Sequence, residues 1–150
     1  MQLVVSLFAV CLPALVLADV IAVQKCTEGA LPTSVDVAGC HSAPCDLPKG
    51  HDAKVMVDFT ASRTLSALRP EVHASFGGLS VPFVLPSDRQ DACKWLVGGQ
   101  CPVSVKEDVT YELQLPVLSS YPTLSLTVEL KLVDQNQDVV TCFQLDARVV

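Results

Sequence analysis

The sequence is short of charge and of aromatic side chains. Charged residues occupy 17% of the 150 positions and aromatic residues 5%, whereas hydrophobic residues occupy 50%. Ten lysines and arginines stand against sixteen aspartates and glutamates, so the formal net charge is −6. Binding to nucleic acid needs clustered positive charge, which excludes that class of partner. Intrinsic disorder is excluded as well, because a chain this apolar can bury enough surface to offset the entropy of folding.

The motifs of common enzyme classes are also missing. None of the three histidines lies in a G-x-S-x-G or H-E-x-x-H pattern. Cys40 and His41, followed by Cys45, have no second pair of ligands, so a metal centre is not expected. Many acidic residues alternate with apolar ones, as on the wet face of a strand, for example Asp58, Glu112, Glu129 and Asp146. We therefore expect no enzymatic activity, no metal and no cofactor.

Long hydrophobic runs are absent except at the N-terminus. Residues 1–18 carry no charged side chain, but the run is interrupted by Pro13 and ends at Ala18. A transmembrane helix needs roughly 20 apolar residues. The pattern is typical of a signal peptide that is cleaved after Ala18, and the rival interpretation is an uncleaved membrane anchor. We expect a secreted, extracellular protein whose single mature domain covers residues 19–150.

The number of cysteines agrees with export. The chain has seven, and removal of Cys11 with the signal peptide leaves 7 − 1 = 6. An even number in an exported chain indicates disulfides. Two pairs are close enough in sequence to form local loops around turn-forming residues, and the remaining two cysteines would then tie the ends of the domain together. The spacing favours the pairs Cys40–Cys45, Cys93–Cys101 and Cys26–Cys142.

Alternation of apolar and polar residues is the dominant local pattern. It is clearest over residues 124–132, where every second residue is a leucine or valine. Prolines and glycines punctuate the segments between such runs. Roughly seven or eight short strands separated by turns favour an all-β, immunoglobulin-like, two-sheet antiparallel β-sandwich. The predicted strands are residues 20–23, 35–38, 55–60, 72–76, 80–85, 111–115, 124–132 and 143–149.

The predicted inward faces of these strands are overwhelmingly aliphatic. Two sheets can interdigitate such side chains into a solid core, as most protein interiors do. They can also stay apart around a hydrophobic pocket for an apolar ligand. The alternation is compatible with both arrangements.

The six cysteines are interleaved with a series of short motifs. In order these are Cys40-x₄-Cys45-x-Leu-x-Lys-Gly, Val55-x-Val57-x-Phe59-Thr60, Val81-Pro82-Phe83, Cys93 and Cys101-Pro102, Leu115-Pro116-Val117, Tyr121-Pro122 and Cys142. Together they resemble the ML (lipid-recognition) domain family over residues 26–150. Within that family the chain is similar to the secreted Niemann-Pick type C branch and its arthropod relatives.

This resemblance implies a function. Members of the family are β-sandwiches that carry a lipid between their sheets without enzymatic activity, so the expected cargo is a sterol such as cholesterol or a fatty-acid-like molecule. The same three disulfides and a monomeric state are implied. Phe83, Tyr121 and Pro122 would form the mouth of the pocket. The other implied lining residues are Val37, Leu47, Val55, Val57, Phe59, Val117, Leu124, Leu126, Val128 and Phe143.

Several features bear on the role of such a carrier. Lys49 and Trp95 are candidates for contact with a membrane or an acceptor protein. Asn136 is the sole asparagine and lies in no glycosylation sequon, which argues against sugar-directed delivery to lysosomes. Leu130 and Phe143 stand where the vertebrate cholesterol carriers of the family have tryptophan, which permits a longer, thinner ligand. Two other functions stay open: an extracellular chemosensory carrier of long-chain semiochemicals, and an innate-immune module that presents microbial lipid to a receptor.

Overall fold

The alternating runs form ten β-strands in the computed structural model, which describes residues 20–150. The predicted signal peptide, residues 1–18, lies outside the described residues. No helix in the described part is long and apolar enough to cross a membrane. The two helices that it contains are short 3-10 helices, η1 (Ser87–Arg89) and η2 (Ala92–Trp95). The strands are β1 (Gln24–Lys25), β2 (Ser34–Val37), β3 (Cys45–Leu47), β4 (His51–Thr60), β5 (Leu68–Phe76), β6 (Leu79–Phe83), β7 (Leu96–Gly98), β8 (Asp108–Val117), β9 (Leu124–Asp134) and β10 (Val139–Val149).

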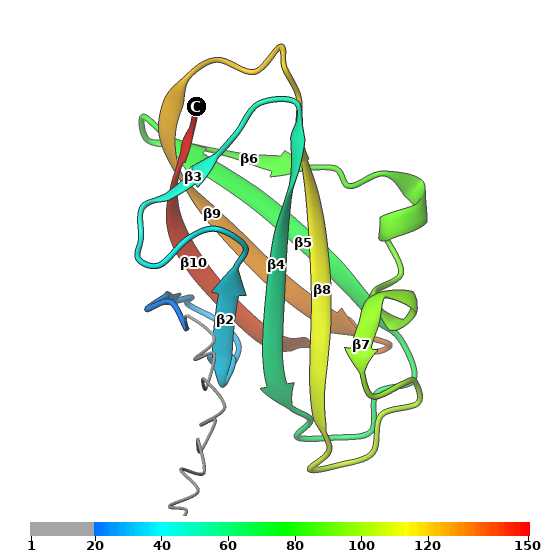
Figure 1. Ribbon diagram of the computed structural model, residues 1–150. Coiled ribbons are helices and arrows are strands. Elements are labelled where there is room, and N and C mark those ends of the chain that lie inside the picture. The colour runs from blue at the N-terminus through cyan, green and yellow to red at the C-terminus, as the bar shows by residue number, and fades with distance from the viewer. Residues whose placement is uncertain (1–19) are drawn as a thin grey trace, which may run out of the picture.

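These strands form two sheets that face each other (Figure 1). The larger sheet has the order β1-β10-β9-β5-β6, with β3 added beside β10. The smaller sheet has the order β2-β4-β8-β7. All named pairings are antiparallel except that of β3 with β10, which is parallel. The predicted all-β sandwich is therefore confirmed.

The first predicted strand is wrong. Residues 20–23 belong to no strand, and β1 begins only at Gln24. The Ile21 side chain is buried, and the backbone N–H of Ile21 donates to the carbonyl oxygen of Val35 at 2.9 Å. This segment is therefore attached to the sandwich through Ile21 and does not pair as a strand. The very short strands β3 and β7 lack enough residues to show alternation, and the sequence did not predict them.

Strand β8 illustrates how alternation builds the core. Val109, Tyr111, Leu113, Leu115 and Val117 are all buried, and the residues between them are half-buried. Burial raises the pKa of the Tyr111 phenol, so this side chain stays neutral over the physiological range. The space between the sheets is consequently lined by uncharged side chains.

Three disulfides brace the sandwich, and they join the three pairs that the spacing favours. Cys40–Cys45 closes the connection that carries the chain from β2 in one sheet to β3 in the other. Cys93–Cys101 closes the loop that contains β7. Cys26–Cys142 has a sequence separation of 116 and fastens the start of the described chain to β10.

A buried carboxylate holds the β9–β10 turn in place. Asp134 accepts hydrogen bonds from the N–H groups of Asn136 (2.9 Å) and Asp138 (3.0 Å) and pairs with the guanidinium of Arg63. Burial alone would raise the pKa of the Asp134 carboxyl, but the Arg63 hydrogen bond, the two N–H groups and the Arg63 charge outweigh it and lower the pKa. Asp134 thus connects the turn to the chain that follows β4.

Replacement of the Asp134 carboxylate should make thermal stability less sensitive to a fall in pH. Because the folded-state pKa is lowered, the stabilisation is present above the unfolded value and is lost as pH falls through the folded value. We expect Asp134→Asn to lower Tm by roughly 5–10 °C at neutral pH. The difference in Tm between the variant and the unsubstituted protein should become smaller below about pH 4. Thermal unfolding followed by circular dichroism across pH measures this, and a constant gap would contradict it.

The long-range disulfide should matter more than the local ones. Closing a loop of this length restricts the unfolded chain by about 5 kcal/mol, against about 2 kcal/mol for the short Cys40–Cys45 loop. We expect the Cys26→Ala/Cys142→Ala variant to lose correspondingly more free energy of unfolding than Cys40→Ala/Cys45→Ala. Denaturant titration of the two variants compares them, and equal losses would refute the expectation.

Candidate ligand-binding pocket

An apolar cavity of about 260 Å³ lies between the sheets at the end of the sandwich where β3 and β10 finish. This volume is close to the lower end of typical ligand pockets, roughly 300–1,000 Å³. The only side-chain polar group in its lining is the hydroxyl of Tyr121. The lining residues are Leu47, Val72, Ala74, Phe76, Val81, Phe83, Leu115, Pro116, Val117, Tyr121, Pro122, Leu124, Leu126, Val128 and Val149.

Two aromatic rings meet at the edge of this cavity. Phe83 ends β6, and Tyr121 lies in the loop between β8 and β9. Their ring centroids are 6.4 Å apart with an interplanar angle of 85°, an edge-to-face contact. The N–H of Tyr121 donates to the carbonyl oxygen of Leu118 at 3.1 Å, and this turn presents the ring to the cavity. Both rings are half-buried and both line the cavity, and we call the edge that they form its mouth.

The β5–β6 hairpin carries the apolar lining out to the surface. Gly77 and Gly78 form its two-residue turn with φ of +56° and +79°, which glycine adopts without strain. Phe76 pairs with Leu79 in the strand register, so their side chains share the face that lines the cavity. Their exposed fractions are 37% and 62%, and that of Val81 is 41%. The hairpin tip therefore extends beyond the cover of the smaller sheet as an apolar rim.

Lys49 lies beside the mouth. Its ammonium donates to the Thr123 hydroxyl at 2.6 Å, next to Pro122. Its backbone N–H donates to the carbonyl oxygen of Val150 at 2.9 Å. The N–H of the following Gly50 donates to Val117 at 2.6 Å. The β3–β4 turn is thus fastened to the ends of the strands that surround the cavity.

A second void, of about 20 Å³, lies deeper between the sheets. The structure divides the predicted lining residues between the two spaces. The larger cavity takes Leu47, Phe83, Val117, Tyr121, Pro122, Leu124, Leu126 and Val128, and the smaller void includes Val37, Val55 and Phe143.

Val57 and Phe59 line neither space, which corrects the prediction for these two residues. They lie farther along β4, opposite Tyr111 and Val109 of β8, and both are buried. Their burial indicates that at this end of β4 the inward side chains are packed as core.

Several lining residues were missed by sequence reasoning. Val72, Ala74, Phe76 and Val81 form the wall made by β5 and β6. Their segments were predicted as strands, but alternation does not say which neighbour covers an inward face. Leu115, Pro116 and Val149 belong to the same group. Leu115 and Pro116 lie in the motif next to Val117, which was the available signal.

Trp95 lies away from the mouth. It is half-buried, packs against the core, and its indole Nε1 donates to the carbonyl oxygen of Asp88 at 2.8 Å. The Arg89 guanidinium sits 6.0 Å from the ring centroid. Helix η2, which carries Trp95, contacts β5 and β8. The side chain therefore folds back onto the sandwich, and the exposed apolar residue of this loop is Val97.

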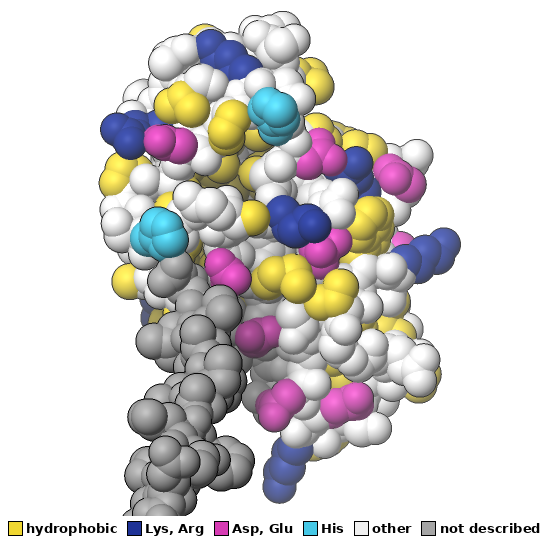
Figure 2. Space-filling view, viewed as in Figure 1, with side chains coloured by type: hydrophobic (Ala, Val, Ile, Leu, Met, Phe, Trp, Pro, Cys, Tyr) yellow, Lys and Arg dark blue, Asp and Glu magenta, His cyan; other side chains and the backbone are white. Residues whose placement is uncertain are grey.

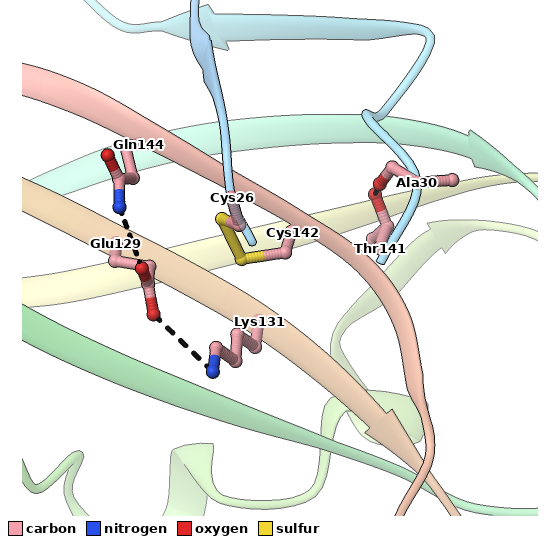
Figure 3. Close-up of a disulfide and its surroundings, with 7 residues drawn as sticks. All are labelled: Cys26, Ala30, Glu129, Lys131, Thr141, Cys142 and Gln144. Atoms are coloured by element: carbon pink, nitrogen blue, oxygen red, sulfur yellow. Dashed lines mark hydrogen bonds and ion pairs between the residues drawn. A yellow bond between two sulfur atoms is a disulfide. The ribbon is translucent and has the colours of Figure 1, made fainter. Parts of the chain in front are cut away.

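One group of potential metal ligands occurs among residues 20–150, namely Cys26, Glu129 and Cys142 (Figure 3). The two sulfurs are bonded to each other, so neither is the thiolate that a metal requires. Glu129 accepts a hydrogen bond from Gln144 at 2.9 Å and lies 3.6 Å from the Lys131 ammonium. These partners account for the carboxylate without a metal.

Charges do not collect into a field of one sign on the face shown in Figure 2, where acidic and basic side chains are interspersed. Ion pairs link neighbouring elements, such as Arg148 of β10 with Asp46 of β3 at 2.9 Å and Arg89 of η1 with Asp52 of β4 at 3.2 Å. The cavity, by contrast, is lined by side chains that are apolar except for Tyr121.

A β-sandwich with an apolar cavity between its sheets is the architecture of a lipid-binding domain. The family model for the ML domain matches residues 20–149. The chain belongs to the ML-domain family, as the cysteine framework indicated.

Curated relatives span most of the chain. "NPC intracellular cholesterol transporter 2" of pig is 32% identical over 139 residues, which is 92% of this chain and 91% of the pig protein. The zebrafish protein of the same name is 33% identical over 116 residues, covering 77% of this chain and 75% of its own length. An ecdysteroid-regulated 16 kDa protein of Manduca sexta is 35% identical over 118 residues, with coverages of 77% and 79%.

Solved structures share the fold. A Niemann-Pick type C2 protein from the Japanese carpenter ant superposes with a TM-score of 0.76 at 19% identity, covering 86% of this chain and 99% of that one. Chicken MD-1, solved in complex with lipid IVa, gives a TM-score of 0.50 at 15% identity, with coverages of 75% and 77%. At these identities the likeness establishes the β-sandwich fold alone.

Truncation at the mouth should separate binding from folding. Phe83 is half-buried and faces the cavity, so Phe83→Ala should weaken binding of an apolar fluorescent probe about tenfold while Tm changes little. Val97→Ala, an exposed position outside the cavity lining, is the control and should bind normally. Probe titration and a thermal melt of each variant measure the two effects. A large fall in Tm for Phe83→Ala would instead assign Phe83 to the core.

Proposed function

We propose that this protein is a secreted, non-enzymatic carrier that takes up a sterol or a fatty-acid-like lipid into the cavity between its sheets. The observation that carries the proposal is the chemistry of the cavity wall, in which every side chain is apolar except Tyr121 at the mouth. Such a site suits a ligand that is hydrophobic along its body and polar at one end.

The energetics of uptake follow from this wall. Each Å² of apolar ligand surface removed from water contributes roughly 25 cal/mol. The hydrocarbon part of a ligand makes no hydrogen bonds with water, so it gives none up when it enters the cavity. Burial of apolar surface therefore drives binding. The Tyr121 hydroxyl supplies one polar contact at the entrance, where a head group would remain. Affinity then depends on shape and buried area, and no catalytic group is required.

The relatives support a lipid cargo. The pig and zebrafish proteins are named as cholesterol transporters, and chicken MD-1 was solved with lipid IVa. The same relatives favour a carrier without enzymatic activity.

We further propose that the rim of the cavity is the surface through which lipid is exchanged with a membrane or an acceptor protein. The β5–β6 hairpin presents Phe76, Leu79 and Val81 beside the opening, and Lys49 lies across from them near Pro122. An apolar rim lets the ligand leave the cavity without crossing water. Trp95, which is folded back, is not part of this proposed surface.

Secretion and a monomeric state complete the proposal. Three disulfides suit an oxidising compartment, and the predicted signal peptide would deliver the chain there. Strand β6 is an edge of the larger sheet and contains Pro82, which has no N–H to donate to a further strand. This edge is therefore poorly suited to pairing with a second copy.

The bound lipid can be identified directly by mass. We expect native mass spectrometry of protein purified from its own source to show a monomer with one bound lipid of sterol or fatty-acid mass. Competition between a fluorescent sterol and a fluorescent fatty acid on the delipidated protein then ranks the two classes. A co-purified volatile long-chain compound would favour the chemosensory role, and a microbial glycolipid the immune role. No binding of either probe at micromolar concentration would exclude a lipid carrier.

A further inference from the structure

The two spaces between the sheets lie end to end along the strands. On β9, Leu126 lines the larger cavity, Val128 lines both spaces and Leu130 lines the inner void. On β8 the same order is Val117, Leu115 and Leu113. Because both strands show this order from the mouth inward, the inner void continues the long axis of the larger cavity.

Three side chains belong to the walls of both spaces. They are Leu47 from β3 and Val128 from β9 in the larger sheet, and Leu115 from β8 in the smaller sheet. Leu47 and Leu115 are buried and Val128 is half-buried. Since they contact the space on either side, they form a constriction between the two. The inner void of about 20 Å³ has room for about one water-sized group.

The elongated path between the sheets suits a chain that lies along the strands. A strand rises about 3.3 Å per residue, so the stretch of β9 from Leu124 to Val128, where the constriction lies, spans about 13 Å. A single hydrocarbon chain can extend along this path and place its terminal methyl group at the constriction.

We propose that Leu47, Leu115 and Val128 act as a stop that sets the length of acyl chain the protein accepts. These three side chains then keep the acyl chain out of the inner void, apart from its terminal group. The inference rests on the proposed lipid-carrier function and deepens it, because it names a single-chain lipid as the ligand class and assigns the residues that determine chain length.

A series of straight-chain saturated fatty acids of increasing length tests the stop, with affinities measured by displacement of a fluorescent fatty acid from the mature protein. While the chain end is still short of the constriction, each added methylene should improve affinity about fourfold. Beyond that length the affinity should become constant. A continued rise through the longest chains would overturn the proposal.

Opening the constriction should move this plateau. Leu115→Ala joins the two spaces, so longer chains gain further buried methylenes, and two of them amount to about fifteenfold in affinity. Val128→Ala is a milder variant, because this side chain is half-buried, and it should shift the plateau in the same direction. Ala53 lines the inner void and pairs with Leu115 in the strand register. Ala53→Leu added to Leu115→Ala should fill the void and restore the original plateau.

The matched control is Val57→Ala, a buried truncation on β4 that lines neither space. It should leave the plateau unchanged. An equal shift in this control, or no shift in both Leu115→Ala and Val128→Ala, would overturn the stop while leaving the carrier function intact. Absence of binding of every fatty acid and of a fluorescent sterol by the unsubstituted protein would overturn the carrier function, and the stop with it.

Discussion

The inner faces of both sheets consist of apolar side chains that must be kept from water, and most of the molecule is arranged around this requirement. In the half of the sandwich remote from the cavity, inward side chains of the smaller sheet such as Val57, Phe59 and Tyr111 are fully buried, so water is excluded there by close packing. Along the other half the two inner faces separate, and the apolar surface is left facing a cavity. A hydrophobic ligand satisfies the same physical demand there that a neighbouring side chain satisfies in the packed half.

Separated sheets need a frame that holds them together elsewhere. The packed half supplies most of the apolar contact, and the disulfides restrain the chain where it passes between or along the sheets. The Asp134 cluster fastens the β9–β10 turn to the chain after β4 at the end remote from the mouth. The end remote from the mouth is thus restrained by this cluster, whereas the mouth itself is built from the β8–β9 loop and the β5–β6 hairpin.

The mouth combines features that a purely structural element would avoid. The β5–β6 hairpin projects apolar side chains into water, and the Phe83–Tyr121 contact joins two segments that no ladder of hydrogen bonds connects. Exposed apolar groups cost solubility, and soluble proteins keep them where they meet a membrane, a partner or a ligand. These exposed side chains and the two rings lie at the edge of the same cavity.

Local patterns in the chain were enough to predict an all-β sandwich and its three disulfide pairs, whereas the placement of Phe83 and Tyr121 at a pocket mouth came from the resemblance to the ML family. Alternation depends only on each strand having one buried face, and the close cysteine pairs depend only on short loops. The same patterns missed β3 and β7 and misplaced the first strand, because two or three residues carry no periodicity. The resemblance also placed Val57 and Phe59 in the pocket, where they do not lie. The sequence pattern of an inward-facing side chain is the same whether the side chain packs against the other sheet or faces a cavity. The distance between the sheets at each point along the strands decides between core and cavity, and that distance is a property of the folded structure.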